Sequence, residues 1–421
     1  MYIVRQLLQK LHILSMIFLM SSCEKLPSSN PPAYLRVMFQ DDPSTSFIIG
    51  WNRFESDRSS DRVYFDTIDH GDNISAYRYS QAPDNYSSYI GFESAFVKLE
   101  NLEPATRYYF IIESNFGITQ RYYVDTLPDD PNERISIISG GDSRNNRLPR
   151  QSANILVKKL KPHFVFFGGD MTNLGTTRQW RQWLEDWQLT IADDGRVTPI
   201  VPARGNHEYS NGILQALFWL PDWNYYSFNV NDLIHVITLN SEVATGGTQL
   251  NWLMDDLANN THTRWTIAQY HKPMRPHVGR KKEGTGQYKH WAQAFYDYGV
   301  DIVFESDAHT VKSTWPLRPS TEVGSFEGFI RDDEHGVVYV GEGCWGAPIR
   351  NADDNKPWTR ESGKFNQFKW SFFDQDKIEV RTVKVDNAQL VDELDLEDRF
   401  EMPNGIDLWE TKYGPVMTIE R

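Results

Sequence analysis

Cysteine is almost absent from this chain of 421 residues, which contains only Cys23 and Cys344. Cys23 stands at the end of a signal-like N-terminus, so Cys344 is left without a partner and no internal disulfide is expected. Gly343 and Trp345 flank Cys344, and this setting favours a small buried core residue over a nucleophile.

A long apolar run is missing from the N-terminus. The run from Ile13 to Met20 is far shorter than the ~20 residues that a membrane-spanning helix needs. Arg5 and Lys10 precede it and Ser21-Ser22-Cys23 follows it, which predicts a bacterial lipoprotein signal peptide over residues 1–22. Lipid on Cys23 would then anchor an exported protein to a membrane of the cell envelope, in the periplasm or at the cell surface. The alternative is an ordinary secretory signal with an incidental cysteine.

Positive charge is scarce, with 43 Lys and Arg against 57 Asp and Glu and a formal net charge of -14. Affinity for nucleic acid comes mostly from clustered Lys and Arg, so a nucleic-acid-binding surface is not expected. This balance does not exclude one small phosphorylated substrate in a local positive site. A Walker loop, a dinucleotide-binding fingerprint and a convincing Ser-His-Asp order are also missing.

The chain is rich in hydrophobic residues (40%) and aromatic residues (14%), which is enough for a large core. Residues 23–33 are polar and rich in Pro and Ser, which is typical of a tether. Residues 34–128 contain short runs of β-branched and aromatic residues separated by turn residues, and this pattern predicts an all-β sandwich. Its expected role is that of a spacer, or of a wall beside the next domain.

The pattern changes at Asp129-Asp130-Pro131, and apolar strands alternate with amphipathic segments over residues 133–386. This alternation predicts an α/β domain with helices on both faces of its sheets. Trp180, Trp183 and Trp187 form a helical stripe that favours packing in the core over ligand binding. A hairpin turning at residues 374–376 is expected to close a sheet. Residues 387–421 form an acidic C-terminal extension with only a weak pattern of apolar residues.

Five predicted strands end in residues that bind metals well. They are Asp142 in GGDSR, Asp170 in GGDMTN, Asn206 with His207 in GNHE, His271 in QYHKP, and Asp307 with His309 in ESDAH. In an open α/β sheet, sites form beyond the carboxyl ends of the strands, so these groups should converge on one edge. Each alone has a simpler explanation as a turn former, helix cap or satisfied histidine. Five such coincidences on one edge favour a metal site.

The ordered set Gly-Asp-x-Arg, Gly-Asp, Gly-Asn-His-Glu, His and x-x-x-His resembles the calcineurin-like metallophosphoesterases. The preceding LENLEPATRYYF and YYVDTLP resemble the fibronectin type III-like domain of purple acid phosphatases, and the resemblance covers roughly residues 34–385. It implies a four-layer αββα domain behind the β-sandwich. It also implies two divalent metal ions, such as manganese, iron or zinc, and phosphate ester hydrolysis by a metal-bound hydroxide.

The resemblance assigns roles to the matching residues. Asp170 would bridge the two metals, with Asp142 and His309 on one of them. Asn206, His271 and Asp307 would bind the other, and Asn173 would be a weak ligand or support a ligand. His207 would contact the phosphate and protonate the leaving group.

Three positions depart from the family pattern. Asp307 replaces the usual His, and its added negative charge favours oxygen-loving ions and comparatively good hydrolysis of diesters. Asp307→His should then raise the preference for monoesters. Asn173 replaces the tyrosine that gives purple acid phosphatases their colour, so this protein should not be purple. Arg144 replaces a common His and is either a phosphate clamp or the partner of Asp142 or Glu305 in a salt bridge.

His277 lies in a loop with several Lys and Arg residues, and two interpretations remain open. The loop is either a mobile basic lip that recruits phosphate, with His277 in a catalytic role, or an ordinary solvated run of charges. Asp307 and His309 are expected to alternate along an extended segment, so that each meets a different metal ion. The sequence favours a phosphomonoesterase. A phosphodiesterase, or a surface binding protein with a degenerate metal site, remains the alternative.

Overall fold

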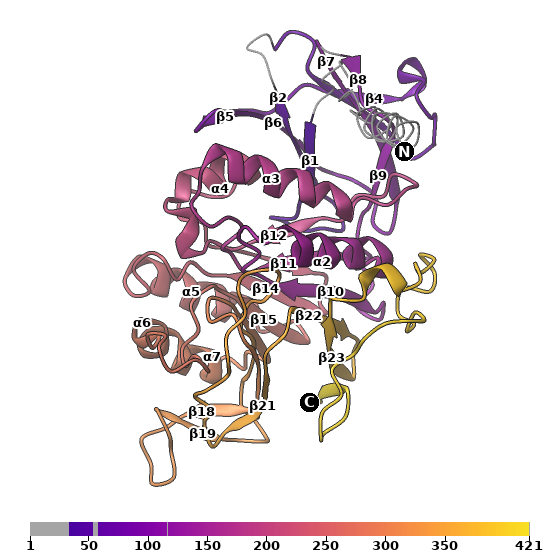
Figure 1. Ribbon diagram of the computed structural model, residues 1–421. Helices are drawn as coiled ribbons and strands as arrows, with labels where there is room; N and C mark the ends of the chain where they lie inside the picture. The colour runs from indigo at the N-terminus through magenta and orange to yellow at the C-terminus, as the bar shows by residue number, and fades with distance from the viewer. Residues whose placement is uncertain (1–32, 54–57, 116, 421) are drawn as a thin grey trace, which may run out of the picture.

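The structure is a computed structural model that describes residues 33–53, 58–115 and 117–420. The predicted signal peptide, Cys23 and the tether as far as residue 32 lie outside this range. Figure 1 shows a β-rich unit at the top and a larger α/β unit below it. Within the described ranges, no helix combines the length and the apolar character needed to cross a membrane.

The upper unit is a β-sandwich, as predicted. Its strands are β1 (Ala33–Met38), β2 (Phe47–Arg53), β3 (Arg62–Asp66), β4 (Tyr79–Gln81), β5 (Asn85–Tyr89), β6 (Phe92–Leu99), β7 (Arg107–Ser114), β8 (Gly117–Ile118) and β9 (Tyr122–Asp125), with a 3-10 turn η1 (Ile74–Ala76). One sheet has the order β1-β2-β6-β5, and the other has the order β4-β3-β7-β8 with β9 also paired to β7. Trp51, Phe96 and Phe110 are fully buried and contribute to its core.

The larger unit contains two further sets of strands. The first set is β10 (Ile135–Gly140), β11 (Phe164–Phe167), β12 (Ile200–Pro202), β22 (Gln367–Phe373), β23 (Lys377–Lys384) and β24 (Val416–Glu420). The second is β13 (Tyr226–Val230), β14 (Ile234–Thr238), β15 (Trp265–Gln269), β16 (Ile302–Glu305), β17 (Val311–Thr314), β20 (Val338–Gly341) and β21 (Thr359–Gly363). The strands β18 (Leu317–Pro319) and β19 (Phe329–Arg331) form a separate ribbon. The predicted hairpin is confirmed as β22 and β23.

Helices cover the outer faces of the two sheets. They are α2 (Arg147–Leu160), α3 (Thr177–Trp187), α4 (Asn211–Phe218), α5 (Thr248–Asn259), α6 (Thr285–Gln287) and α7 (Gln293–Asp297), with short turns η2 (Gln188–Thr190), η3 (Asn206–Glu208), η4 (Tyr288–Ala292) and η5 (Ala388–Leu390). Phe166 on β11 packs edge-on against Phe304 of the second sheet, and its neighbour Phe167 packs against Trp183 of α3. This alternation follows the period of two in a strand, so one face meets the other sheet and one meets a helix. The predicted four-layer αββα arrangement is confirmed, and the tryptophan stripe lies in the core.

The direction of the strands brings the candidate residues together. Strands β10, β11 and β12 run parallel, and so do β14, β15, β16 and β20. The carboxyl ends of parallel strands share one edge of their sheet. The loops after β10, β11, β12, β15 and β16 are therefore the ones that build the site.

Two connections extend beyond the predicted units. Strand β1 pairs with β12 in parallel, so one sandwich sheet continues into the first sheet of the α/β unit and gives ten strands in all. Strand β24, from the predicted C-terminal extension, pairs with β23 and forms the opposite edge of the same sheet.

Candidate metal centre

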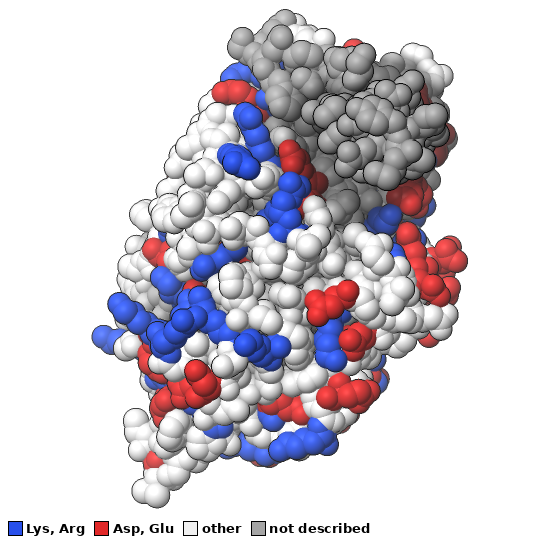
Figure 2. Space-filling model, viewed as in Figure 1, with Lys and Arg blue, Asp and Glu red and all other residues white. Residues whose placement is uncertain are grey.

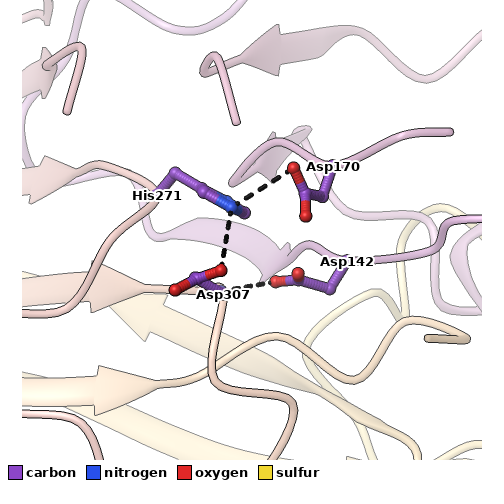
Figure 3. A group of neighbouring side chains, drawn as sticks. All are labelled: Asp142, Asp170, His271 and Asp307. Carbon is purple, nitrogen blue, oxygen red and sulfur yellow. Dashed lines mark hydrogen bonds and ion pairs between the residues drawn. The ribbon is translucent and has the colours of Figure 1, made fainter. Parts of the chain in front are cut away.

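Four buried side chains form the centre of the candidate site. Asp142, Asp170, His271 and Asp307 each offer one ligand atom, and these atoms all lie within 4.8 Å of one another (Figure 3). They come from the loops after β10, β11, β15 and β16. Asn206 joins them, because its Oδ1 lies 3.2 Å from Nε2 of His271. The convergence of these loops on one site is what strand direction predicts.

The backbone of this site is left-handed at several residues. The φ angles are +58° at Asp142, +54° at Asp170, +65° at Asp307 and +58° at His309. Such a conformation costs a residue other than glycine of the order of 1–3 kcal/mol, and it persists only where the surrounding structure enforces it. The expected extended run through Asp307 and His309 is therefore wrong: a turn at each residue aims its side chain at the cluster.

Asp170 lies between the two sets of predicted ligands. Its Oδ1 lies 3.3 Å from Nε2 of His271 and accepts a hydrogen bond from the backbone N–H of His207 at 2.8 Å. Burial alone would raise the pKa of Asp170, but the charges of His271 and neighbouring cations lower it below its ordinary value. Asp170 is thus a buried carboxylate held in its ionised form.

His271 of the cluster and His309, which lies against Asp142, are oriented in the same way. Nδ1 of His271 lies 2.7 Å from the carbonyl of Gly168, and Nδ1 of His309 lies 3.1 Å from the carbonyl of Pro348. A carbonyl only accepts hydrogen bonds, so each Nδ1 carries the proton. In a neutral ring, each Nε2 then directs a lone pair toward carboxylate oxygen: His271 toward Asp170, and His309 toward Asp142 at 2.9 Å.

A lone pair facing a carboxylate is unfavourable unless a cation or a second proton lies between them. Oδ1 of Asp142 and Nε2 of His309 are both buried without a hydrogen-bond partner among the described residues. Burial would lower the pKa of His271, but the charges of Asp170 and Asp142 raise it well above its ordinary value. A divalent metal ion would satisfy these atoms together, and a backbone carbonyl on the other nitrogen is a usual support for a metal-binding histidine. The residues present therefore fit metal ions.

His207 lies at the edge of the cluster. Its Nδ1 hydrogen-bonds the carbonyl of Asn173, and its Nε2 is 3.8 Å from Oδ2 of Asp170. Its side chain is 20% exposed, so it can reach a bound molecule. Asn173 meets the site through its backbone carbonyl, and the structure shows no contact of its side chain with the cluster within the described part of the chain.

Glu208 holds two of the loops together. Its carboxylate accepts hydrogen bonds from the backbone N–H groups of Gly205 at 2.7 Å, Asp170 at 3.0 Å and Met171 at 2.8 Å. Burial, followed by the charge of Asp170, raises its pKa to about 7. Glu208 therefore supports the backbone beneath the His207 ring.

Three basic residues border the cluster. Arg144 forms a salt bridge with Oδ2 of Asp170 at 2.9 Å, so the predicted salt-bridge partners Asp142 and Glu305 are wrong. Lys281 pairs with Oδ1 of Asp307, and its side chain is 20% exposed. Arg350 donates to the backbone carbonyl of Asp307 at 3.1 Å. Lys281 belongs to the basic loop that follows His277 in the sequence, and Arg350 follows no recognisable motif.

Glu305 and His277 have partners that the sequence did not predict. Glu305 pairs with buried Lys312 and accepts a hydrogen bond from Tyr270 at 2.6 Å, so it does not contact Arg144. His277 is fully buried, and its ring meets the hydroxyl of Thr359 at 2.7 Å. It is therefore neither on an exposed basic lip nor on a solvated loop. The exposed part of that loop begins at Gly279, two residues later.

Comparison with known proteins agrees with the arrangement of the chain. The calcineurin-like phosphoesterase family model matches residues 143–311, and the model of the purple acid phosphatase N-terminal domain matches residues 32–126. This chain is a calcineurin-like metallophosphoesterase with a purple acid phosphatase N-terminal domain. Two uncharacterized proteins from two strains of Mycobacterium tuberculosis are each 23% identical to it over 338 residues. That alignment covers 68% of this chain and 63% of each relative, so the metallophosphoesterase spans less than two thirds of their length.

Solved structures show the same fold. A purple acid phosphatase, PPD1, from seeds of yellow lupin (Lupinus luteus) superposes with a TM-score of 0.70 at 16% identity, covering 88% of this chain and 76% of the plant chain. PhoD superposes with a TM-score of 0.64 at 11% identity, covering 94% of each chain. At these identities, the likeness establishes the architecture of the metallophosphoesterase and leaves its substrate to the chemistry of its own site.

Proposed function

We propose that this metallophosphoesterase hydrolyses phosphate monoesters at a centre of two divalent metal ions. The observation that carries the proposal is the pair of buried histidines, His271 and His309. Each is pinned through Nδ1 to a backbone carbonyl and directs Nε2 at a carboxylate. That arrangement leaves cation-binding atoms facing one another in the interior, which is unfavourable for a binding protein with a degenerate site.

The ligands would divide between two positions around Asp170. Asp142 and His309 would hold one ion, and Asn206, His271 and Asp307 would hold the other. When bound, two such ions supply Lewis-acid activation of water and neutralise charge on the phosphoryl group. The mixed set of oxygen and imidazole donors suits manganese, iron or zinc.

The chain's own residues would bind and orient the phosphate. Arg144 and Lys281 lie against the carboxylates of the cluster and present N–H donors to its open side. Figure 2 shows Lys and Arg side chains gathered at mid-height on the face over α5 and α6, although the molecule as a whole is acidic. A local positive field of this kind attracts a small anion without creating a surface for polyanions.

His207 would supply a proton to the leaving group. The carbonyl of Asn173 fixes Nδ1, so Nε2 is the atom free to give a proton to a substrate oxygen. The carboxylate of Asp170 lies 3.8 Å from this atom, so the proton donor stands beside the metal cluster.

The contact between Lys281 and Asp307 favours monoesters over diesters. Asp307 brings a negative charge that would weaken binding of a dianionic monoester. The ammonium of Lys281 cancels this charge at the same carboxylate. The electrostatic reason for a diesterase is therefore removed, and a dianionic substrate fits the site.

The test combines metal content with turnover. Wild-type protein, Asp170→Asn and the control Asp193→Asn would be purified without chelators and analysed for metals. Each would then be assayed with a phosphate monoester and a diester; the control residue is 89% exposed. We expect close to two ions per wild-type chain, monoester turnover, and a loss of metal with at least a 100-fold loss of activity in Asp170→Asn only. Full activity in Asp170→Asn would show that turnover does not depend on this centre. No metal after soaking in excess, without turnover, would favour the binding-protein alternative.

We further propose that the protein is exported and anchored to the cell envelope through lipid on Cys23. The proposal rests on the N-terminal charge, the short apolar run and the residues before Cys23. In a bacterial host, Cys23→Ser should move the protein from the membrane fraction to the soluble fraction. An unchanged distribution would contradict the lipid anchor.

A further inference from the structure

Exposed apolar side chains lie beside His207. Tyr209 is 60% exposed, Leu174 is 58% exposed and Ile90 is 42% exposed. They come from three places: the loop after β12, the loop after β11 and the turn between β5 and β6. Large apolar side chains this exposed suggest a binding surface when they gather at a site.

Tyr209 packs directly against His207, the proposed proton donor. Its ring meets the ring of His207 edge-on, with centroids 6.0 Å apart, and its hydroxyl donates to the carbonyl of Asn173 at 3.4 Å. A Cβ at Gly175 would lie only 3.0 Å from Cδ2 of Tyr209, so the tyrosine ring rests on this glycine. Leu174 precedes Gly175, so its backbone adjoins the residue against which the ring of Tyr209 packs.

The β-sandwich reaches the same place. The hydroxyl of Thr177 donates to the carbonyl of Ile90 at 2.7 Å, and the hydroxyls of Tyr89 and Ser210 lie 2.7 Å apart. These contacts tie the β5–β6 turn to the loops that carry Leu174 and Tyr209. The N-terminal domain thus reaches the loops beside His207, in addition to any role as a spacer.

His207 has charged side chains on one side and uncharged side chains on another. On one side are the carboxylates and the basic residues that fit a phosphoryl group. The ring of Tyr209 packs against His207 on another side. Together with the exposed side chains of Leu174 and Ile90 on the neighbouring loops, it makes up what we call the apolar wall. Since His207 is near both sides, an ester oxygen that receives its proton from Nε2 would lie close to both.

We propose that the apolar wall binds the leaving group, and that the substrates are phosphate monoesters whose alcohol carries an aromatic or flat apolar group near the ester oxygen. This inference rests on the proposed phosphatase function. In the reaction, water adds its oxygen to phosphorus, the bond from phosphorus to the ester oxygen breaks, and His207 gives its proton to that oxygen. The released alcohol then leaves along the wall, and His207 is reprotonated by solvent.

The test uses two esters with similar leaving-group basicity, 2-phenylethyl phosphate and ethyl phosphate. Metal-loaded wild type, Tyr209→Ala and Leu174→Ala would be compared with Leu390→Ala, which removes a leucine that is 76% exposed on η5. An aromatic contact contributes about 0.5–1.5 kcal/mol, so Tyr209→Ala should lower the ratio of kcat/KM for the aromatic ester over the ethyl ester roughly 2- to 10-fold. Leu174→Ala should lower it less, and Leu390→Ala should leave it unchanged.

Binding of phosphonates, measured by calorimetry, separates this inference from the proposed function. Wild-type protein should bind benzylphosphonate more tightly than methylphosphonate, and the difference should shrink in Tyr209→Ala. Turnover of both esters with equal ratios in all variants would overturn the apolar wall while leaving the phosphatase intact. A phosphonate preference that depends on Tyr209, without turnover of either ester, would support the wall and overturn the phosphatase.

Discussion

At the scale of single residues, the site depends on side chains placed by unusual backbone angles. Asp142, Asp170, Asp307 and His309 all have positive φ, and all are buried. Glycine supports this geometry where loops approach closely: a Cβ at Gly205 would lie 2.4 Å from both the backbone nitrogen and Oδ1 of Asp170. The strain is local, and it is offset by the contacts that the cluster makes.

His207 should be needed for protonation of the leaving group and not for metal binding. His207→Gln should lower kcat for an alkyl phosphate about 10²- to 10⁴-fold, because a general acid contributes that much. The loss should be much smaller with 4-nitrophenyl phosphate, whose leaving group needs no proton, and the metal content should stay at the wild-type value. An equal loss with both esters would argue against the acid role.

Lys281 should compete with metal for Asp307. Its ammonium pairs with Oδ1 of that carboxylate, so Lys281→Met should tighten binding of the more weakly held ion and weaken binding of inorganic phosphate. Both affinities can be measured by calorimetry, with exposed Lys282→Met as the matched control. Looser metal binding in Lys281→Met would show that the pair supports the site instead of competing for it.

At the scale of elements, a buried ion network joins the strands behind the site. Lys312 on β17 pairs with Glu305 at the end of β16 and with Glu342, next to β20, at 2.7 Å from the latter. All three side chains are at most 1% exposed. The carbonyl of Glu342 also accepts the backbone N–H of His309 at 2.8 Å, so this network lies directly beneath a predicted ligand.

Removing the cation of this network should be strongly destabilising. Lys312→Met leaves two carboxylates buried without their partner, and breaking a buried pair in this way costs about 3–5 kcal/mol. Lys158→Met is the control, because its partner Asp193 is 89% exposed and such pairs contribute less than about 1 kcal/mol. Urea unfolding of both variants would measure the difference, and equal losses would contradict a structural role for the network.

Strand β22 carries a buried lysine that should make stability depend on pH. Burial lowers the pKa of Lys369 from 10.5 to about 7, and its Nζ donates to the hydroxyl of Thr382 at 2.8 Å. Between these two pKa values the unfolded chain keeps a proton that the folded chain has lost, so stability rises with pH. The burial penalty is therefore largest at and below about pH 7 and fades as the pH approaches 10.5.

Lys369→Met should remove this dependence. The variant should be more stable than wild type near pH 7, and its advantage should fall by about 1.4 kcal/mol for each pH unit as the pH rises. Urea unfolding at several pH values, with the same metal concentration throughout, would measure it. A difference that does not change with pH would mean that the lysine keeps its ordinary pKa.

At the scale of the whole molecule, the sandwich and the α/β unit share one sheet and one core. Phe39 packs edge-on against Phe164 of β11, with centroids 6.0 Å apart. Phe96 packs against Trp219 at 5.8 Å, and the buried guanidinium of Arg36 donates to the carbonyl of Leu217 at the end of α4. One hydrophobic core cluster therefore includes buried residues from both units.

The two units should unfold together. Calorimetry at saturating metal should give one transition whose van't Hoff and calorimetric enthalpies agree. Phe39→Ala should lower the temperature of that transition without splitting it, by a loss of about 3–5 kcal/mol. Two separate transitions in the wild type would show that the sandwich folds independently.

The sequence by itself determined which segments form strands and helices, the α/β class of the larger unit and the residues that meet at the metal centre. These follow from local patterns: apolar periods define strands and helices, and polar residues at the ends of parallel strands share an edge. Cys344 and the tryptophan stripe were placed in the core for the same reason, and both are buried. The candidate metal ligands were found because they follow strands directly.

Only the tertiary structure decided which side chains are partners. Arg144 pairs with Asp170, Lys281 pairs with Asp307, and Glu305 pairs with Lys312. The side chain of His277 is buried. Each of these contacts depends on loop conformations and on segments far apart in the sequence. The positive φ angles at Asp307 and His309 and the pairing of β1 with β12 determine the contacts around them. Neither feature produces a periodic pattern in the sequence. Local pattern therefore fixes the elements, and packing between distant loops fixes the chemistry of the site.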